Sequence, residues 1–352
     1  MSRVIILGAG ASFGHGVHGE LRPPLADGFF SDKVAEAILA EYRQLTDYLQ
    51  RTYGLSTRRL AEIDIEQLFT LVEGSWRLGI YNREEIVHRF GASFRAGGPP
   101  LLLQSYVTDR IFLATRWLIG HTCPLHRRLF SLLLRDGGTV ITFNYDLIAD
   151  VTLKRLRLWK ELDGYFNESP FDSTQTGPHN VTLLKPHGSL NWYKDPKRGV
   201  ESIGVLTLED VLSRDNYSAI IPKLGRALER DDESRGFAEG AAVVPTYLLP
   251  LFVLPTPNKD FRELSYGELK GVWRSVFKAL ELAGEVTAIG FSFRDPHFNQ
   301  VLAEAARFRS NPLRLLVVAP SSLSPEVSRL RDVPHLRLSH FDGTLSDFVA
   351  AL

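Results

Sequence analysis

Short apolar runs that end in glycine-rich or polar turns recur along this chain and constrain its fold more than any other feature. The first run, residues 4–7 (Val-Ile-Ile-Leu), leads directly into Gly8 and Gly10. Such runs are typical of the central strands of a parallel sheet, which are buried on both faces. Further β-like runs lie at residues 139–143, 181–184, 243–254, 286–291 and 313–318.

Helical stretches separate several of these runs. Residues 266–282 and 298–308 have apolar positions at helical spacing between the later runs. This alternation predicts a Rossmann-like, doubly wound α/β fold with a mostly parallel sheet. Open sheets of this kind bind ligands outside the carboxyl ends of their strands, so the residues that follow each run are the candidates for a site.

Residues 33–135 have a different pattern, with helical spacing and few β-branched runs. They predict a large helical insertion after the first strand, inside a single domain of residues 1–352 whose Rossmann-like core comprises residues 1–32 and 136–352. The helical stretches within the insertion are residues 33–51, 64–78 and 105–119.

Glycine and proline positions predict two loops. Gly97, Gly98, Pro99 and Pro100 are expected to form a loop inside the insertion. Residues 231–240 are polar and contain glycine, and they are a candidate mobile loop.

Charge and cysteine content exclude several classes of function. Lysine plus arginine and aspartate plus glutamate both total 41, so no global positive field favours nucleic acid or an anionic membrane as a partner. Cys123 is the one cysteine, which excludes an intramolecular disulfide and a zinc site built on several thiolates. The first apolar run is too short for a signal segment or a membrane span, and we expect a cytoplasmic protein.

The turn after the first run is a candidate phosphate-binding site. Small residues there let backbone amides approach a pyrophosphate without an intervening side chain. The dinucleotide fingerprint is incomplete, because Phe13 stands at its final glycine position. A tight turn without a ligand is the alternative. The residues concerned are Gly8, Ala9, Gly10, Ala11 and Ser12.

Polar residues follow the run at 139–143. Asn144 is an uncharged donor and acceptor that could orient a water or a ribose hydroxyl. Asp146 is a candidate for a ribose contact. The alternative is that both side chains cap the next helix.

A histidine follows the run at 181–184. His187 lies between Pro186, which restricts the backbone, and Gly188, which frees it. An imidazole is the usual general base near neutral pH, so His187 is the candidate base. His297 is the next best placed histidine, but it is expected at a helix start.

The run at 286–291 also ends in a glycine-serine turn. Gly290, Phe291 and Ser292 are candidates for contacts to the adenosine half of a dinucleotide. The alternative is a strand-to-helix turn capped by Ser292 or Asp295. Residues 319–322, after the last run, are candidates for contacts to the adenine.

Together, these motifs occur in the order found in sirtuin-like proteins, and the similarity extends from residue 4 to around residue 320. The chain resembles the sirtuin-like NAD-hydrolase family of bacterial anti-phage defence systems. The resemblance implies that Asn144 and His187 are catalytic and that the glycine turn at residues 8–12 binds the cofactor phosphates. It also implies cofactor contacts from Asp146, Gly290, Phe291 and Ser292.

The chain departs from the protein deacylases among sirtuin-like proteins. Those enzymes carry a four-cysteine zinc ribbon and a glutamine at the position of Phe143, whereas this chain has only Cys123. We therefore expect no metal. The resemblance implies hydrolysis of NAD+, as substrate, to nicotinamide and ADP-ribose, in an effector that depletes NAD during abortive infection. Residues 23–30 and 64–66 also look like segments of that group.

Two other functions remain open. An NAD-dependent protein deacylase would share the cofactor site but use an acylated lysine in place of water. An assembly protein could bind NAD or ADP-ribose without turnover. A hydride-transfer dehydrogenase fits Asn144 and His187 less well.

The resemblance also implies regulation, because an NAD-depleting effector must stay silent until it is triggered. We expect activation through self-assembly into a homo-oligomer, or through a separate partner such as a HerA-type ATPase or an Argonaute-like protein. Direct binding of nucleic acid or membrane is not expected. The helical insertion offers surface for such contacts.

Overall fold

The computed structural model describes residues 2–13, 23–80, 83–90, 98–161, 165, 179–194, 203–212, 250–253, 267–307, 309–320 and 323–352. The loop predicted at residues 231–240 lies outside these ranges, as does most of the run at 243–254.

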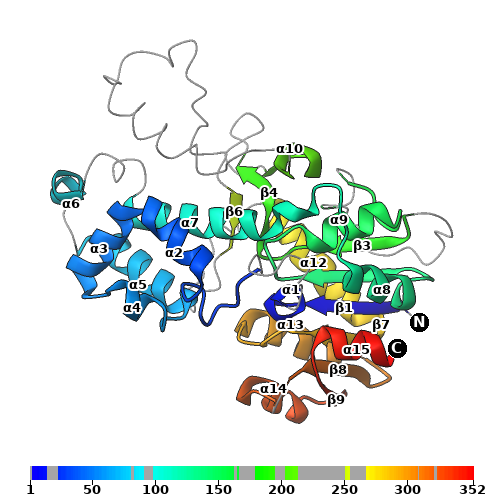
Figure 1. Ribbon diagram of the computed structural model, residues 1–352. Helices are drawn as coiled ribbons and strands as arrows, with labels where there is room; N and C mark the ends of the chain where they lie inside the picture. The colour runs from blue at the N-terminus through cyan, green and yellow to red at the C-terminus, as the bar shows by residue number, and fades with distance from the viewer. Residues whose placement is uncertain are drawn as a thin grey trace.

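Six parallel strands form the main sheet, in the order β3-β2-β1-β7-β8-β9 (Figure 1). The chain thus starts in the middle of the sheet, builds outward to one edge, and then builds outward to the other. This order is that of a doubly wound α/β fold, so the predicted fold class is confirmed. The strands are β1 (Ser2–Leu7), β2 (Gly138–Thr142), β3 (Val181–Leu184), β7 (Ala283–Ile289), β8 (Leu313–Ala319) and β9 (Leu336–Asp342).

The central position of β1 explains its composition. It pairs with β2 on one side and β7 on the other, and Val4, Ile5 and Ile6 are fully buried. A strand covered on both faces needs apolar side chains at successive positions, not at alternate ones. The apolar runs therefore predicted the buried strands to within a few residues.

The edge strand β9 was not predicted from the sequence. Residues 336–339 alternate between apolar and polar side chains, and Leu336 is the one residue of the strand that is buried. A search for continuous apolar runs misses an alternating strand, because only one of its faces meets the core.

A second, antiparallel sheet was also not predicted. Its order is β5-β4-β6, and β4 begins at the residue after His187. The strands are β4 (Gly188–Lys194), β5 (Ile203–Val205) and β6 (Pro250–Phe252).

Two groups of helices pack on the main sheet. Helix α12 contacts β1, β3 and β7 and packs against α13, whereas α15 contacts β8 and packs against α8, which in turn packs on α9. These helices and the short α1 are α1 (Ala9–Phe13), α8 (Pro124–Leu133), α9 (Ile148–Arg155), α12 (Gly267–Leu282), α13 (Pro296–Arg307) and α15 (Leu345–Ala351). Two short helices, α10 (Leu208–Leu212) and α14 (Pro325–Arg329), follow β5 and β8.

The helical insertion between β1 and β2 lies beside the main sheet in Figure 1. Helix α7 is its central element, since α2, α3 and α5 all pack on it. The helix predicted at residues 33–51 is two helices, because the backbone leaves the helical region at Tyr42 (φ −98°, ψ 42°). The elements are α2 (Lys33–Glu41), α3 (Arg43–Tyr53), α4 (Thr57–Leu60), α5 (Ile65–Arg77), α6 (Arg83–Phe90) and α7 (Gly98–Thr115).

The loop predicted at Gly97–Pro100 is wrong for its described residues. Gly98, Pro99 and Pro100 form the first turn of α7. Proline is well tolerated there, because the first amides of a helix have no carbonyl partner within it. The division into a core and an insertion at residues 33 and 135 stays a prediction.

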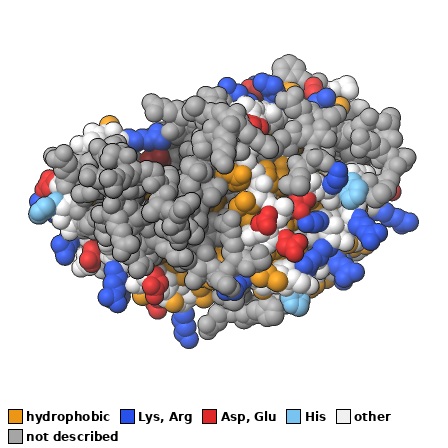
Figure 2. All heavy atoms as spheres, turned by 90° about the horizontal axis from the view of Figure 1, so that it is seen from above, with side chains coloured by type: hydrophobic (Ala, Val, Ile, Leu, Met, Phe, Trp, Pro, Cys, Tyr) orange, Lys and Arg blue, Asp and Glu red, His pale blue; other side chains and the backbone are white. Residues whose placement is uncertain are grey.

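Charged side chains of both signs lie side by side on the part of the surface in Figure 2 that the described residues form. This mixture agrees with the equal totals of basic and acidic residues. Across the described ranges, none of the helices combines the length and the apolar character that crossing a membrane requires.

Candidate functional site

The candidate site residues follow strands that lie next to each other in the main sheet. Leu7, the last residue of β1, is paired with Thr142 of β2 and with Ile289 of β7. The carboxyl ends of these strands therefore meet at the point where the strand order reverses, which is where doubly wound sheets bind ligands.

The turns after β1 and β7 interlock through glycine. The Gly8 amide donates to the Ile289 carbonyl (3.1 Å) and the Gly10 amide to the Gly290 carbonyl (3.0 Å). A Cβ atom on Gly8 would lie 2.4 Å from the Gly290 oxygen, and one on Gly290 would lie 2.3 Å from the Ala11 amide nitrogen. These glycines are therefore needed for the close approach of two backbones. The Ala11 amide also donates to the Gly8 carbonyl (2.9 Å), so at least three amides of residues 8–12 already have carbonyl acceptors. The phosphate-binding role of these residues stays a prediction.

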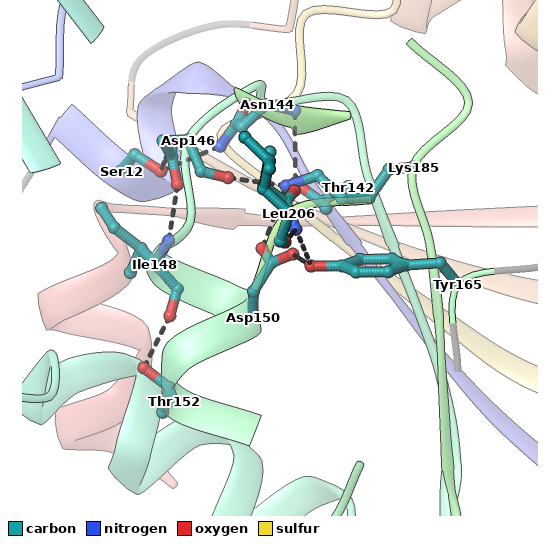
Figure 3. Close-up of polar contacts among 11 residues, drawn as sticks. Ser12, Thr142, Asn144, Asp146, Ile148, Asp150, Thr152, Tyr165, Lys185 and Leu206 are labelled. Atoms are coloured by element: carbon teal, nitrogen blue, oxygen red, sulfur yellow. Dashed lines mark hydrogen bonds and ion pairs between the residues drawn. The ribbon is translucent and has the colours of Figure 1, made fainter. Parts of the chain in front are cut away.

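Asn144 is held in one orientation by Gly8 and by Ser12 of helix α1. Its Nδ2 donates to the Gly8 carbonyl (2.9 Å) and to the Ser12 hydroxyl (2.9 Å; Figure 3). An amide nitrogen has two hydrogens, and both are used in these bonds. Oδ1 is therefore the atom that Asn144 can offer to a water or a ribose hydroxyl.

The Ser12 hydroxyl continues this chain of hydrogen bonds. It accepts from Asn144 and donates to Asp146 Oδ2 (2.8 Å), while Asp146 Oδ1 accepts from the Ile148 amide (2.9 Å). The second bond engages the first amide of α9, but the N-cap residue of that helix is Leu147, one position after Asp146. Burial raises the pKa of Asp146, and the charge of Lys185 opposes this shift. Ser12 and Asp146 are both buried, and their described contacts position Asn144.

A buried polar network lies next to Asp146. Lys185 Nζ donates to the Asp146 carbonyl (2.6 Å) and to Asp150 Oδ2 (2.9 Å), and neither side chain of this ion pair is exposed (Figure 3). Asp150 also accepts from the Tyr165 hydroxyl, to which Asn191 donates. Burial raises the pKa of Tyr165. The network thus ties α9 and the second sheet to the end of β3.

His187 is fixed between the two sheets. Its carbonyl accepts from the Val253 amide (2.8 Å), and Gly188, at φ +86°, begins β4. A Cβ atom on Gly188 would lie 1.9 Å from the Leu251 oxygen, so only glycine fits there. Gly188 was predicted to free the backbone after His187. Its positive φ is the conformation in which the chain enters the second sheet.

The ring of His187 pairs with Asp295, which lies in the turn after β7. The distance from Nε2 to Asp295 Oδ2 is 2.8 Å, and both side chains are almost completely buried. Asp295 Oδ1 accepts from the amides of His297 (3.0 Å) and Phe298 (3.3 Å) at the start of α13. The sequence predicted a helix cap at this position, but not the bond to His187.

Aromatic rings surround the His187 side chain. Phe143 packs edge-on against it, with 4.8 Å between ring centres, and stacks on Phe291 at 4.5 Å. Phe291 is buried and belongs to this aromatic wall, whereas Ser292 is exposed. Phe143 is also the residue directly before Asn144. It therefore connects Asn144 in the chain to the aromatic residues around His187.

Within the described ranges, no three or more His, Cys, Asp or Glu side chains are grouped so that they could hold a metal ion. The expectation of a site without metal stays a prediction. Of the candidate adenine contacts at residues 319–322, residues 321 and 322 lie outside the described residues.

Comparisons with known proteins add the following. No family model and no curated protein matches the chain. Among solved structures, a Sir2 homologue in complex with NAD aligns with a TM-score of 0.46 and 12% identity, over 99% of this chain and 86% of that one. Sir2Tm bound to a propionylated peptide aligns with a TM-score of 0.41 and 11% identity, over 100% of this chain and 91% of that one. The doubly wound fold is established by the strand order of this chain and does not depend on these alignments.

Proposed function

We propose that this chain is an NAD+ glycohydrolase that converts NAD+ and water to nicotinamide and ADP-ribose. The observation that carries the proposal is the fixed orientation of Asn144, whose amide nitrogen is bound by Gly8 and Ser12 at the carboxyl ends of the strands. The pair of His187 and Asp295, from the turns after β3 and β7, lies beside Phe143, the residue that precedes Asn144. The resemblance of the ordered motifs to sirtuin-like NAD hydrolases supports the same reaction.

In the proposed reaction, the bond between the nicotinamide nitrogen and the ribose C1′ breaks, and its electron pair stays with the nitrogen. Nicotinamide leaves as a neutral molecule, and positive charge develops on the ribose. Asn144 Oδ1 has two lone pairs, and it accepts hydrogen bonds from one ribose hydroxyl and from the attacking water and holds them in line. The water oxygen forms the new bond to C1′, and His187 takes the proton that the water loses and releases it to solvent.

Other residues at the carboxyl ends of the strands are proposed to bind the rest of the substrate. The pyrophosphate is proposed to lie beside the turn of residues 8–12, with contacts from the turn of residues 290–292. The aromatic wall of Phe143 and Phe291 limits access of bulk water to His187, which strengthens electrostatic interactions there.

The test is incubation of the purified chain with NAD+, with nicotinamide and ADP-ribose separated by chromatography. We expect both products in equal amounts from the wild type, and a loss of about 100-fold or more in rate for Asn144→Ala and for His187→Ala. Asn311→Ala and His121→Ala change the same residue types at exposed positions and should retain full activity.

Other outcomes would identify the alternative functions. A product carrying an acyl group, formed only with an acylated lysine peptide, would show a deacylase. Tight NAD binding without nicotinamide release at high protein concentration, alone or with an added partner, would show a binding protein and contradict the proposal.

We also propose a biological setting for this activity. The chain would act in the cytoplasm as the NAD-depleting effector of an anti-phage defence system. Self-assembly into a homo-oligomer, or a partner such as a HerA-type ATPase or an Argonaute-like protein, would activate it. Support comes from the resemblance of the motifs. Measurement of cellular NAD after phage infection, with wild type and with Asn144→Ala, tests the role.

A further inference from the structure

We infer that Asp295 is the positioning residue of His187: it selects the tautomer of the imidazole and holds the ring in place. This inference rests on the proposed function for its catalytic consequence. The two residues are separated by 108 positions, and they meet because β3 and β7 end at the same edge of the sheet.

The two oxygens of Asp295 have different partners. Oδ1 accepts from two amides at the N-terminus of α13, and Oδ2 faces Nε2 of His187. The helix dipole favours a negative charge at this end of a helix of 12 residues. The cap therefore fixes the carboxylate in place and favours its charged form, independently of the histidine.

Burial of both side chains strengthens the hydrogen bond between His187 and Asp295. The side chains of His187 and Asp295 are 5% and 4% exposed, so little water competes for the bond between them. A charged acceptor forms a stronger hydrogen bond than a neutral one, particularly where the dielectric constant is low.

The pairing determines which ring nitrogen acts as the base. A carboxylate only accepts hydrogen bonds, so a neutral His187 must carry its proton on Nε2. The lone pair is then on Nδ1, and Nδ1 is the atom that takes the proton from the water in the proposed reaction. The carboxylate also stabilises the imidazolium that results.

Asp295→Asn tests this role with little change in shape. The asparagine oxygen can still cap α13, because asparagine is a good N-cap residue. Its NH2 group, however, now faces Nε2 as a donor, so the ring must carry its proton on Nδ1 and cannot accept there. We expect kcat to fall about 100-fold or more, while KM for NAD+ and the melting temperature change little.

Asp32→Asn is the matched control. Asp32 also caps a helix with one oxygen, at the Ala35 amide (2.7 Å), and binds a buried side chain, Arg110, with the other. It lies in the insertion, so its replacement should leave kcat within about twofold of the wild type. A loss of kcat in Asp295→Asn but not in Asp32→Asn would separate positioning from capping.

A second readout does not depend on catalysis. In the protein labelled with 15N at histidine, the nitrogen shifts of His187, assigned by their absence in His187→Gln, report the tautomer. We expect the Nε2–H form in the wild type and the Nδ1–H form in Asp295→Asn. An unchanged tautomer, or a kcat within twofold of wild type, would overturn the inference. Absence of NAD+ turnover in the wild type, both alone and with an added partner, would instead contradict the proposed function, and the tautomer alone would then decide the role of Asp295.

Discussion

Ser12 donates a 2.8 Å hydrogen bond to Asp146, a residue 134 positions later in the chain. The same hydroxyl accepts from Asn144. Helix α1, which follows β1, therefore holds the turn after β2, and the hydroxyl of one buried serine sets the orientation of the proposed catalytic amide.

Replacement of this serine should affect both stability and activity. Ser12→Ala removes a donor to the buried Asp146 carboxylate and an acceptor from Asn144, so we expect a loss of about 1–3 kcal/mol in the free energy of unfolding. NAD+ turnover should fall about 10-fold, because Asn144 keeps only the Gly8 carbonyl as a fixed acceptor. Denaturant unfolding and product assays measure the two effects. Ser31→Ala, at an exposed serine, should change neither.

Gly290→Ala should damage the interlock between the turns after β1 and β7. Gly290 has φ +57°, and its new Cβ would lie 2.3 Å from the Ala11 nitrogen. Gly54 is the matched control, because it has φ +66° but no atom within 4 Å of an added Cβ. We expect about 1–2 kcal/mol of destabilisation for Gly54→Ala and a clearly larger loss for Gly290→Ala. Equal losses in denaturant unfolding would show that the close approach adds no constraint.

Removal of one partner of the ion pair between Lys185 and Asp150 should strongly destabilise the protein. Neither side chain is exposed, so Lys185→Met leaves an uncompensated buried carboxylate, and we expect a loss of about 3–5 kcal/mol. The double variant Lys185→Met/Asp150→Asn removes both charges and should recover part of this loss. Denaturant unfolding of the three proteins is the measurement. A double variant less stable than the single one would contradict the electrostatic explanation.

Arg294 connects the helical insertion to the turn that contains Asp295. Its guanidinium binds Asp64 Oδ2 (2.8 Å) and Asp27 Oδ2 (3.1 Å), and the side chain of Asp64 is 9% exposed while that of Asp27 is 71% exposed. Water screens exposed pairs more strongly. Double-mutant cycles with Arg294→Gln should therefore give a coupling of about 1 kcal/mol or more for Asp64→Asn and about 0–0.5 kcal/mol for Asp27→Asn. A larger coupling free energy for Asp27 than for Asp64 would contradict the role of burial.

Asp109 should make stability depend on pH. Burial raises its pKa to about 7, against the opposing hydrogen bond from Tyr42, which is 2.5 Å long. In the unfolded chain the pKa of an aspartate is about 3.9, so between about pH 4 and pH 7 the folded protein binds more protons. The contribution of Asp109 to stability is therefore present at low pH and lost as the pH rises to about 7.

The variant Asp109→Asn tests this dependence. Relative to the variant, the wild type should lose about 1–4 kcal/mol of stability between about pH 4 and pH 7, with no further change above that range. Denaturant unfolding at several pH values measures the difference. Parallel curves for the two proteins would contradict the raised pKa.

Local patterns in the sequence predicted the strands that are buried on both faces, the helices α12 and α13, and the residues at the carboxyl ends of the strands. Such predictions succeed because a strand that is buried on both faces, such as residues 4–7, needs apolar side chains at successive positions, whichever strands lie beside it. They failed at β9, where one face meets the core, and at Gly98–Pro100, where two prolines begin a helix.

The sequence by itself determined that Asn144 and His187 follow strands of a doubly wound sheet. Only the tertiary structure decided their partners: Ser12 for Asn144, and Asp295 for His187. These bonds join residues more than 100 positions apart, and they depend on which strands are neighbours in the sheet and on how far each turn extends. Strand order results from the packing of the whole domain, so it cannot be predicted from the local spacing of residues.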